Sequence, residues 1–257
     1  MLLALDVGNT HMTIGVFRGT EILRRWRLTT VHERTVDELG IFLRQLCQWA
    51  EIRPTDIRGV IVGSVVPQID GAMRAAIATY LDAEPLFVAP GIRSGMPLRV
   101  ETPLELGADR LCNAVAAFAE HGGPCVVVDF GTATTWDVVS SRGEFLGGVI
   151  APGLEISAEA LFSRAAKLPR IELAAPERVI GKGTVDSMQA GIVLGYVGLT
   201  EGITRRVLAE LGGGTVIATG GLASVIARYT EIFDAVDDDL TLKGLRLLWE
   251  RNHGERG

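Results

Sequence analysis

The chain has 257 residues, of which 47% are apolar, and a formal net charge of −6. This length allows one large domain or two ordinary ones, each able to bury a core. The acidic balance and the lack of a dense Lys/Arg cluster argue against a nucleic-acid-binding surface, and no apolar run reaches the roughly 20 residues that span a bilayer.

The first segment, residues 2–28, predicts a three-stranded antiparallel meander. Apolar residues alternate along it, and Arg18-Gly19 marks a turn. The opening residues lack a basic n-region and carry an acid at position six, so we expect a first strand rather than a signal peptide. The RRWR run at 24–27 alternates like a strand and predicts no nucleic-acid contact.

Alternating helices and strands are expected to follow. Residues 35–51 have helical spacing, with Thr35 as the N-cap and Glu38 completing a capping box. We then expect a buried strand at 59–67, a helix at 69–82 and a short strand at 85–89.

Residues 89–107 are rich in Pro and Gly and have no clear periodicity, so they predict either a surface excursion or a functional loop. A helix begins at Gly107 and carries Asp109 and Arg110 in its first turn. An acid is favourable at a helix N-terminus, but the adjacent arginine gains nothing from the helix dipole. The pair therefore favours a substrate site, where arginine binds a carboxylate and aspartate accepts a hydroxyl proton.

Residues 125–151 repeat the pattern of the opening segment. In both, an apolar run ends in aspartate (Asp6, Asp129) and is followed by an apolar residue, a glycine and a polar residue. The repeat favours a duplicated half over a chance similarity of two hairpins. Further elements are expected as follows: helices at 153–166, 186–211, 222–229 and 240–252, and a strand at 215–221.

Each Asp-Gly-polar turn alone is explained by a hairpin, but two such turns indicate phosphate binding. Glycine lets backbone N–H groups approach phosphate oxygens, and a carboxylate beside them requires a cation in between. We therefore expect Asp6 to position Mg²⁺ or its waters and Asp129 to hold a second cation. The glycines at 218–223 predict either a close strand–helix turn or an adenosine-binding face. No P-loop or Rossmann fingerprint is present.

Three well-separated cysteines, Cys47, Cys112 and Cys125, indicate reduced thiols and a cytoplasmic location. The four histidines form no zinc-binding pattern.

The sequence resembles the type III pantothenate kinases, members of the acetate and sugar kinase/Hsp70/actin superfamily. The resemblance covers essentially the whole chain and depends on many blocks in order. They are DVGNTH at 6–11, GADR at 107–110, VVVDFGTATTWDVV at 126–139, GGVIAPG at 147–153, AKLP at 166–169, GKGTVDSMQAG at 181–191, TGGLA at 219–223 and DLTLKGL at 239–245.

This resemblance implies an α/β fold of two duplicated ribonuclease-H-like halves (the actin-like ATPase fold) with a cleft between them. The N-terminal half would be residues 1–118, with the first phosphate loop. The C-terminal half would be residues 119–257, with the second phosphate loop and a dimer helix.

The implied reaction is ATP-dependent phosphorylation of pantothenate to 4′-phosphopantothenate, the first step of coenzyme A biosynthesis. ATP phosphates would contact Asp6, Val7, Gly8, Asn9, Thr10, His11, Met12, Thr13 and Thr132. Pantothenate would contact Gly107, Ala108, Asp109, Arg110 and Thr184. Asp109 would be the catalytic proton acceptor, Asp129 would bind potassium or ammonium, and Asp6 would contact Mg²⁺ through water.

The resemblance also implies a homodimer in which Thr184 reaches the substrate from the partner subunit. Apolar residues on several sides of the helix from Asp186 onward favour the same assembly. Neither a nucleic acid nor a membrane is expected as a partner. Val100 stands where many family members have tyrosine, so a tyrosine contact with the substrate is absent here.

Two alternatives remain open at this stage. One is a non-catalytic relative of the same fold, similar to the Bvg accessory factor that assists transcription. The other is a phosphotransferase of the same superfamily that acts on a different small alcohol. The joint presence of Asp6, Asp109, Arg110, Asp129 and Thr184 favours the pantothenate kinase.

Overall fold

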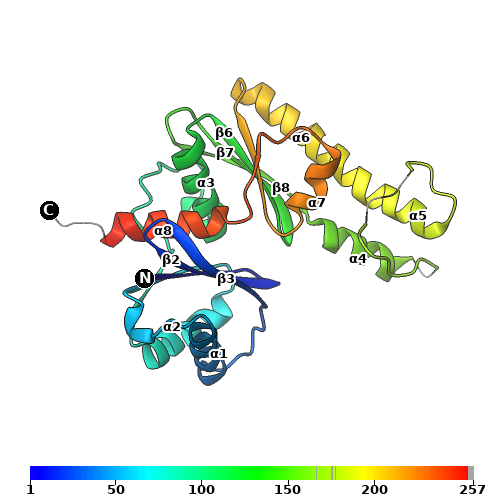
Figure 1. Ribbon diagram of the computed structural model, residues 1–257. Coiled ribbons are helices and arrows are strands. Elements are labelled where there is room, and N and C mark those ends of the chain that lie inside the picture. The colour runs from blue at the N-terminus through cyan, green and yellow to red at the C-terminus, as the bar shows by residue number, and fades with distance from the viewer. Residues whose placement is uncertain (166, 175, 177, 254–257) are drawn as a thin grey trace. The chain divides into compact units, whose positions relative to one another are not determined.

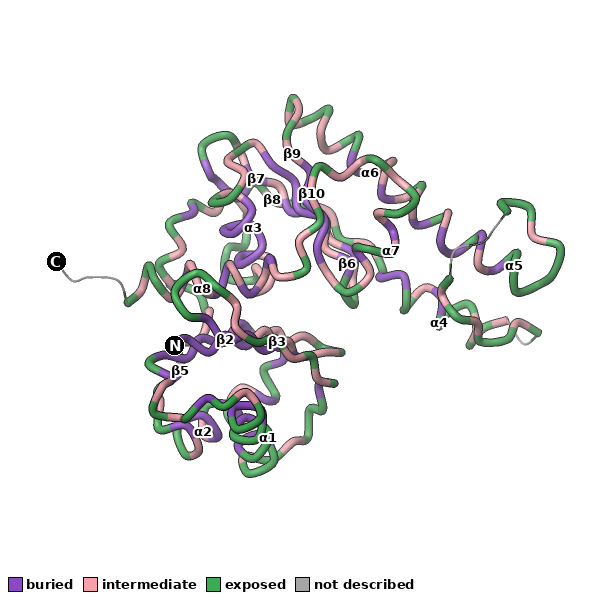
Figure 2. The backbone as a smooth tube through the Cα atoms, in the orientation of Figure 1, coloured by how far each residue is buried: buried purple, intermediate pink, exposed green. Residues whose placement is uncertain are grey.

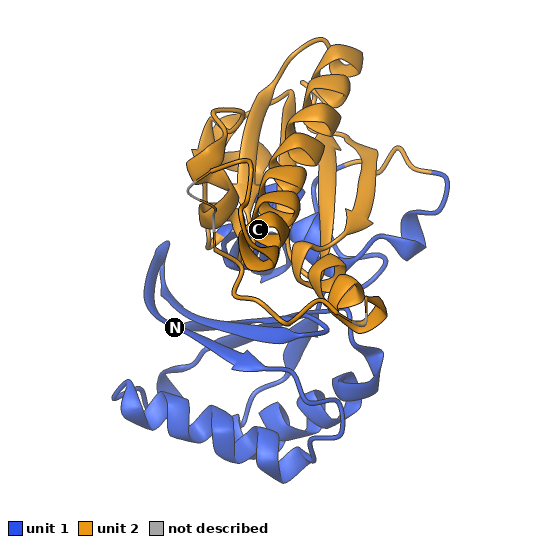
Figure 3. Ribbon diagram, turned by 90° about the vertical axis from the view of Figure 1, so that its right-hand side faces the viewer, with its two compact units in different colours: residues 1–96, 101–116, 240–257 blue, residues 97–100, 117–239 orange. Residues whose placement is uncertain are grey.

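The computed structural model describes residues 1–165, 167–174, 176 and 178–253. The chain forms two compact units (Figure 3). Unit 1 comprises Met1–Met96, Glu101–Ala116 and Leu240–Gly257, and unit 2 comprises Pro97–Val100 and Ala117–Asp239. Each unit contains one five-stranded sheet.

Unit 1 has a mixed sheet in the order β3-β2-β1-β4-β5. Strands β1, β2 and β3 form the predicted antiparallel meander, and β4 and β5 are added parallel to β1. The strands are β1 (Leu2–Val7), β2 (His11–Arg18), β3 (Glu21–Thr29), β4 (Gly59–Ser64) and β5 (Pro85–Phe87).

Three helices pack on this sheet (Figure 1). Helices α1 (Val36–Trp49) and α2 (Pro67–Leu81) bury Leu3, Leu5 and Val7 of β1 in the main apolar core of the unit. Helix α8 (Leu240–His253) packs on the opposite face, over Gly15, Gly59 and Gly63 of the sheet. The predicted capping box is confirmed: the Glu38 amide donates to Oγ1 of Thr35, and the Thr35 amide donates to the Glu38 carboxylate.

Unit 2 has the equivalent strand order, β10-β9-β6-β7-β8. Read from β8, this sheet has the order third-second-first-fourth-fifth strand of its unit, as the sheet of unit 1 has when read from β3. This is the arrangement expected from a duplicated half. The strands are β6 (Cys125–Phe130), β7 (Ala133–Val139), β8 (Phe145–Pro152), β9 (Thr215–Thr219) and β10 (Ala235–Val236).

The helical part of unit 2 covers the face of β6 that carries Val126, Val128 and Phe130. The helices are α4 (Leu154–Arg164), α5 (Thr184–Gln189), α6 (Gly195–Leu211) and α7 (Ala223–Ile226). A π-helical segment, Ala190–Leu194, joins α5 to α6, so the helix predicted at 186–211 is continuous but irregular. Strand β10 was not predicted because two residues carry no measurable periodicity.

Helix α3 (Ala108–His121) begins where the sequence predicts, directly after Gly107. The short helices are 3₁₀ turns at Pro54–Asp56, Pro103–Glu105 and Ala227–Tyr229, the last of which ends the helix predicted at 222–229. Ala166, the last residue of the helix predicted at 153–166, lies outside the described residues.

The compact units differ from the predicted halves, 1–118 and 119–257, at the C-terminal helix. Helix α8 belongs to unit 1 because its apolar side chains fill the space above glycines of that sheet. A Cβ atom on Gly59 would lie 2.1 Å from the Trp249 ring, and one on Gly63 would lie 3.0 Å from Leu245. These contacts are long-range in sequence, so amphipathic spacing alone does not reveal them.

Strands β1 and β6 have the same pattern of burial, and each is buried except at its aspartate. Figure 2 shows β6 among the buried stretches of the backbone. Side chains alternate between the faces of a strand. Asp6 and Asp129 therefore lie on the sheet face opposite the apolar core of their own unit. Along the described part of the chain, no helix is long and apolar enough to cross a bilayer.

Candidate active site

The first glycine turn joins β1 to β2 and is closed by backbone hydrogen bonds. The Gly8 amide donates to the His11 carbonyl at 3.0 Å. Thr30 holds the turn from outside: its Oγ1 donates to the Gly8 carbonyl at 2.7 Å, and its amide donates to the Thr10 carbonyl at 3.0 Å. Thr30 was missed by sequence reasoning, since a single hydroxyl at the end of a strand is not a distinctive signal.

The side chains of this turn divide into two groups. Val7 and Met12 are buried in the core, so only their backbones can contact a ligand. Asn9 and Thr10 are exposed. The His11 ring shares a hydrogen bond with Nη2 of Arg27 at 3.0 Å, which ties it to β3. The turn therefore offers backbone groups and short polar side chains, as phosphate binding requires.

Asp6 lies next to the predicted acceptor segment within unit 1. It pairs with Gly63 across the parallel strands β1 and β4 and with Thr13 of β2. A Cβ atom on Gly63 would lie 3.7 Å from the Cβ of Ala108, the first residue of α3. The structure therefore brings the first glycine turn and the Gly107–Arg110 segment to the same edge of one sheet, where parallel strands end and ligands commonly bind.

The first turn of α3 shapes the surroundings of Asp109. The Leu111 amide donates to the Gly107 carbonyl at 3.1 Å, which starts the helix. Oδ1 of Asp109 accepts a hydrogen bond from the Arg110 amide at 2.8 Å. Burial raises the pKa of the Asp109 carboxyl, and the hydrogen bond and charge of Arg110 only partly oppose that rise. A carboxylate of raised pKa is suited to proton transfer.

Cys112 lies one turn further along α3 and is fully buried. Burial raises the pKa of its thiol well above the usual range, and the charges of Asp6 and Asp109 raise it further. The same two carboxylates thus act on one buried group, which agrees with their placement at one edge of the sheet. Cys112 is accordingly a neutral packing residue and not a nucleophile.

The second glycine turn joins β6 to β7 and is one residue shorter than the first. Its Gly131 amide donates to the Ala133 carbonyl at 3.0 Å. The Thr132 carbonyl accepts a hydrogen bond from the Gly153 amide at 3.1 Å, and a Cβ atom on Gly153 would lie 2.2 Å from that carbonyl. Thr132 therefore lies beside Gly153, the residue that precedes α4.

The third glycine motif, at 218–223, lies against Asp129. Asp129 pairs with Thr219 across β6 and β9. Gly220 follows with φ +92°, and a Cβ atom there would lie 2.4 Å from Oδ1 of Asp129. A side chain is excluded at this position, because the Asp129 carboxylate lies directly against the backbone of Gly220. Within the described residues, no group of three or more His, Cys, Asp or Glu side chains could hold a metal ion, so a cation at Asp129 would need oxygen ligands from the backbone, hydroxyls or the substrate.

Thr184 is the first residue of α5 and is exposed. It lines a groove of about 640 Å³ together with Leu161 of α4 and Met188 of α5. The residues that line this groove include neither Asp129 nor Thr132. Unit 2 therefore brings Asp129, Thr132 and Gly220 near one another and places Thr184 in a separate groove.

The helix from Asp186 onward uses most of its apolar residues inside its own unit. Met188, Ile192, Val193 and Tyr196 are all buried. The exposed apolar side chains lie instead before this helix, at Ile180 (84% exposed), and on α4. The surplus of exposed apolar residues that the sequence predicts on this helix is therefore not found there, and exposed apolar side chains lie beside it.

The family is decided by comparison with known proteins. Residues 2–206 match the family model described as type III pantothenate kinase. The chain belongs to the type III pantothenate kinase family.

Relatives named type III pantothenate kinase match almost the whole chain. The protein from Moorella thermoacetica is 51% identical over 253 residues, which cover 98% of this chain and 100% of the relative. The protein from Koribacter versatilis is 49% identical over 263 residues, which cover 98% of this chain and 96% of the relative.

Solved structures of low identity share the fold. A putative 2-dehydro-3-deoxygalactonokinase from Sinorhizobium meliloti has a TM-score of 0.62 at 13% identity and covers 100% of this chain and 98% of its own. A putative Baf family transcriptional activator from Campylobacter jejuni has a TM-score of 0.60 at 18% identity, with coverage of 97% and 98%.

The activator of the 2-hydroxyisocaproyl-CoA dehydratase from Clostridium difficile, solved with bound ADPNP, has a TM-score of 0.54 at 16% identity, with coverage of 97% and 95%. The predicted actin-like fold of the type III pantothenate kinase family is confirmed.

Proposed function

We propose that this protein transfers the γ-phosphoryl group of ATP to the primary hydroxyl of pantothenate, giving 4′-phosphopantothenate. Its membership of the family and relatives of about 50% identity over nearly the whole chain support this reaction. The observation that carries it is the meeting of Asp6 and the Gly107–Arg110 segment at one edge of the sheet in unit 1. That edge holds a phosphate-type turn beside a carboxylate–arginine pair.

The first glycine turn would hold the phosphates of ATP. Gly8, Asn9 and Thr10 would supply backbone groups and short side chains, and Asp6 would orient water molecules on Mg²⁺. Mg²⁺ bound with ATP supplies neutralisation of the charge that develops during phosphoryl transfer. Thr132 of the second turn would add a hydroxyl contact to a phosphate.

Asp109 and Arg110 would position pantothenate. Arg110 would bind the pantothenate carboxylate through charge-assisted hydrogen bonds. Asp109 would keep the attacking hydroxyl aimed and accept its proton as the new bond forms. The raised pKa of Asp109 supports this role, because a base is most effective when its pKa approaches the working pH.

Asp129 would hold a monovalent cation, potassium or ammonium. Asp129 lies against the backbone of Gly220, where backbone oxygens would join the carboxylate as ligands of such an ion. A cation there would allow a carboxylate to lie beside phosphate without repulsion.

A homodimer would complete the acceptor site with Thr184 from the partner subunit. The exposed apolar side chains around the α4–α5 groove support a second copy as the occupant of this face. The buried free thiols Cys47, Cys112 and Cys125 suit a reducing compartment, and we place the enzyme in the cytoplasm.

The proposed function is tested by measuring ADP formation by the purified protein with and without pantothenate, and with potassium present or replaced by sodium. The expected result is ADP formation that requires pantothenate, together with 4′-phosphopantothenate as the product identified by mass spectrometry. If the rate of ATP consumption does not depend on pantothenate but rises with another small alcohol, that alcohol is the acceptor. No ATP consumption with any acceptor would favour a non-catalytic role.

A further inference from the structure

The segment Pro97–Val100, here called the strap, makes an isolated β-bridge to the sheet of unit 2. The Arg99 amide donates to the Phe145 carbonyl at 2.8 Å, and the Phe145 amide donates to the Pro97 carbonyl at 2.9 Å. Leu98 and Phe145 thus pair as a parallel bridge at the start of β8, the edge strand of the sheet. The chain on either side of the strap, up to Met96 and from Glu101, belongs to unit 1.

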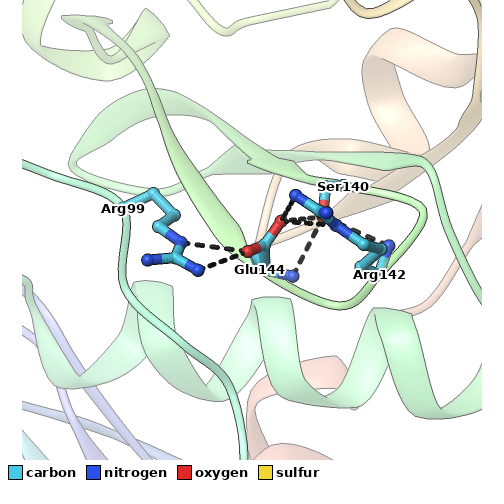
Figure 4. Close-up of polar contacts among 4 residues, drawn as sticks. All are labelled: Arg99, Ser140, Arg142 and Glu144. Carbon is cyan, nitrogen blue, oxygen red and sulfur yellow. Dashed lines mark hydrogen bonds and ion pairs between the residues drawn. The ribbon is translucent and has the colours of Figure 1, made fainter.

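Glu144 clamps the strap to the β7–β8 hairpin (Figure 4). Its side chain is largely buried, with 9% of its surface exposed. Oε1 accepts two hydrogen bonds from Arg99, from Nε at 2.9 Å and from Nη2 at 2.8 Å. Oε2 accepts hydrogen bonds from Arg142 at 3.2 and 3.0 Å and from the Ser140 hydroxyl at 3.2 Å.

The two carboxylate oxygens of Glu144 therefore bind different segments of the chain. Oε1 binds the strap, which is 45 residues away in sequence, and Oε2 binds the hairpin that carries Glu144 itself. These bonds, that of Arg99 first, lower the pKa of the Glu144 carboxyl, so it stays ionised. A largely buried carboxylate depends on its hydrogen-bond partners, and Arg99 is the partner that connects it to the strap.

The strap leads directly into the segment that ends at Gly107. Val100 lies over Gly147 of β8, 3.8 Å from a Cβ atom placed there. From Glu101 the chain runs through a 3₁₀ turn at Pro103–Glu105 and reaches Gly107 six residues later. The strap and the start of α3 are thus joined by a short connection that is partly helical.

Contacts on the upstream side are independent of Glu144. The Arg93 amide donates to Oδ1 of Asn252 at 3.2 Å, and the Asn252 side-chain amide donates to the Arg93 carbonyl at 3.1 Å. The loop is thus fixed to α8 before the strap and to β8 at the strap. Loss of the Arg99–Glu144 contact therefore leaves the upstream contacts intact and weakens the attachment of the part that leads to Gly107–Arg110.

We propose that Glu144 is a positioning residue for the acceptor site, acting through Arg99 to hold the strap on β8 and so to fix the approach to Gly107–Arg110. This inference rests on the proposed function, because that function gives Gly107–Arg110 the acceptor. Glu144 and Arg99 need not touch the substrate for this role.

Arg99→Ala tests the proposal, with Arg142→Ala as its matched control. Both variants remove one guanidinium from the same carboxylate, but only Arg99 contacts the strap. We expect Arg99→Ala to raise the KM for pantothenate by roughly tenfold to a hundredfold, the range expected for a small misplacement of a positioned group, with little change in the KM for ATP. Arg142→Ala is expected to leave both KM values within about twofold of wild type, because Arg142 lies on the hairpin and does not contact the strap.

Two further measurements exclude a merely structural effect. Arg99→Lys, which keeps a charge on the strap, should restore part of the pantothenate KM that Arg99→Ala loses. Hydrogen exchange at the Arg99 and Phe145 amide positions should accelerate in Arg142→Ala far less than in Arg99→Ala. Equal effects of the two alanine variants on KM, or faster exchange in Arg99→Ala without a change in KM, would overturn the positioning role.

The exchange measurement also separates this inference from the proposed function. A wild-type protein that forms no ADP with pantothenate overturns the proposed function and with it the acceptor role of the clamp. A wild-type protein that is active, with an Arg99→Ala variant that is kinetically unchanged, overturns the clamp alone.

Discussion

Gly220 lies directly against Asp129: a Cβ atom on Gly220 would approach Oδ1 of that carboxylate to 2.4 Å and the Phe130 backbone to 2.7 Å. The two residues come from different strand ends, β6 and β9, which are adjacent in the sheet. The glycine motif at 218–223 is therefore a close-approach position beside a carboxylate, in addition to a turn between strand and helix.

Gly220→Ala is expected to impair the enzyme more than backbone strain alone would. At φ +92° any side chain is strained, typically by about 1–3 kcal/mol, and here the new methyl group would also displace Asp129. Gly212→Ala is the control, because Gly212 has φ +83° and open space around its Cα. Turnover and melting temperature of both variants are to be measured. Similar melting temperatures of the two variants, with a loss of turnover only in Gly220→Ala, would support the cation site. If both variants lose turnover and melting temperature to the same extent, backbone strain explains the effect.

The cation itself is tested with Asp129→Asn. We expect wild-type turnover to require potassium or ammonium and to fall in sodium alone, because Asp129 would need a monovalent cation beside phosphate. In Asp129→Asn the difference between potassium and sodium should disappear. A wild-type enzyme that turns over at equal rates in buffers without potassium and ammonium would remove this role from Asp129.

Asp109→Asn and Arg110→Ala should separate catalysis from binding. Asparagine keeps the size of the side chain but accepts no proton, so turnover at saturating pantothenate should fall by about 10²–10⁴-fold with a small change in pantothenate binding. Arg110→Ala should mainly weaken binding. In wild type, kcat/KM should rise with pH through an apparent pKa above the ordinary 3.8 of aspartate, since burial raises the pKa of Asp109. Near wild-type turnover in Asp109→Asn would move the catalytic role toward Asp6.

Asp109→Asn should lower turnover but raise the stability of the folded protein at neutral pH. Because the folded-state pKa of Asp109 is raised, the protonated carboxyl contributes stability that is complete below 3.8 and is lost as pH rises through the folded-state pKa. At neutral pH the buried charge therefore costs stability that a neutral asparagine does not. We expect Asp109→Asn to melt at a higher temperature than wild type at pH 7 and at the same temperature near pH 3. A lower melting temperature at pH 7 would show that the carboxylate is well solvated or paired.

Much of the fold could be predicted because the responsible interactions are local. The capping box at Thr35 and Glu38, the meanders after Asp6 and Asp129, and the start of α3 at Gly107 depend on neighbouring residues and regular periodicity. The duplication was visible because both halves keep the same pattern at the same strand position.

The contacts that organise the candidate site were not predictable in this way. Thr30 on the first turn, Gly220 against Asp129, and Arg99 on Glu144 join residues 22, 91 and 45 positions apart. Nothing in local spacing marks such pairs, because a hydroxyl, a glycine or an arginine is common at the end of any strand or loop. The sequence likewise shows only that Val100 replaces a tyrosine common in the family, and not that it lies on the strap.

The last prediction concerns Thr184 and uses mixed dimers. If the acceptor site combines Asp109 of one subunit with Thr184 of the other, Asp109→Asn and Thr184→Arg are each defective alone. In a heterodimer of the two variants, one site carries both defects and the other carries none. Co-expression with two different affinity tags, followed by purification through both tags, isolates the heterodimer. By two-fold symmetry it should regain about half of wild-type turnover.

The controls for this experiment are the two homodimers taken through the same purification and a wild-type heterodimer with the same tags. Thr184 is exposed at the start of α5, so arginine there should fold and act by occupying the groove. Recovered turnover requires that Thr184 acts across subunits, because a site made within one chain would remain defective in both subunits. A heterodimer as inactive as either homodimer, or a fully active monomer in solution, would contradict the shared site.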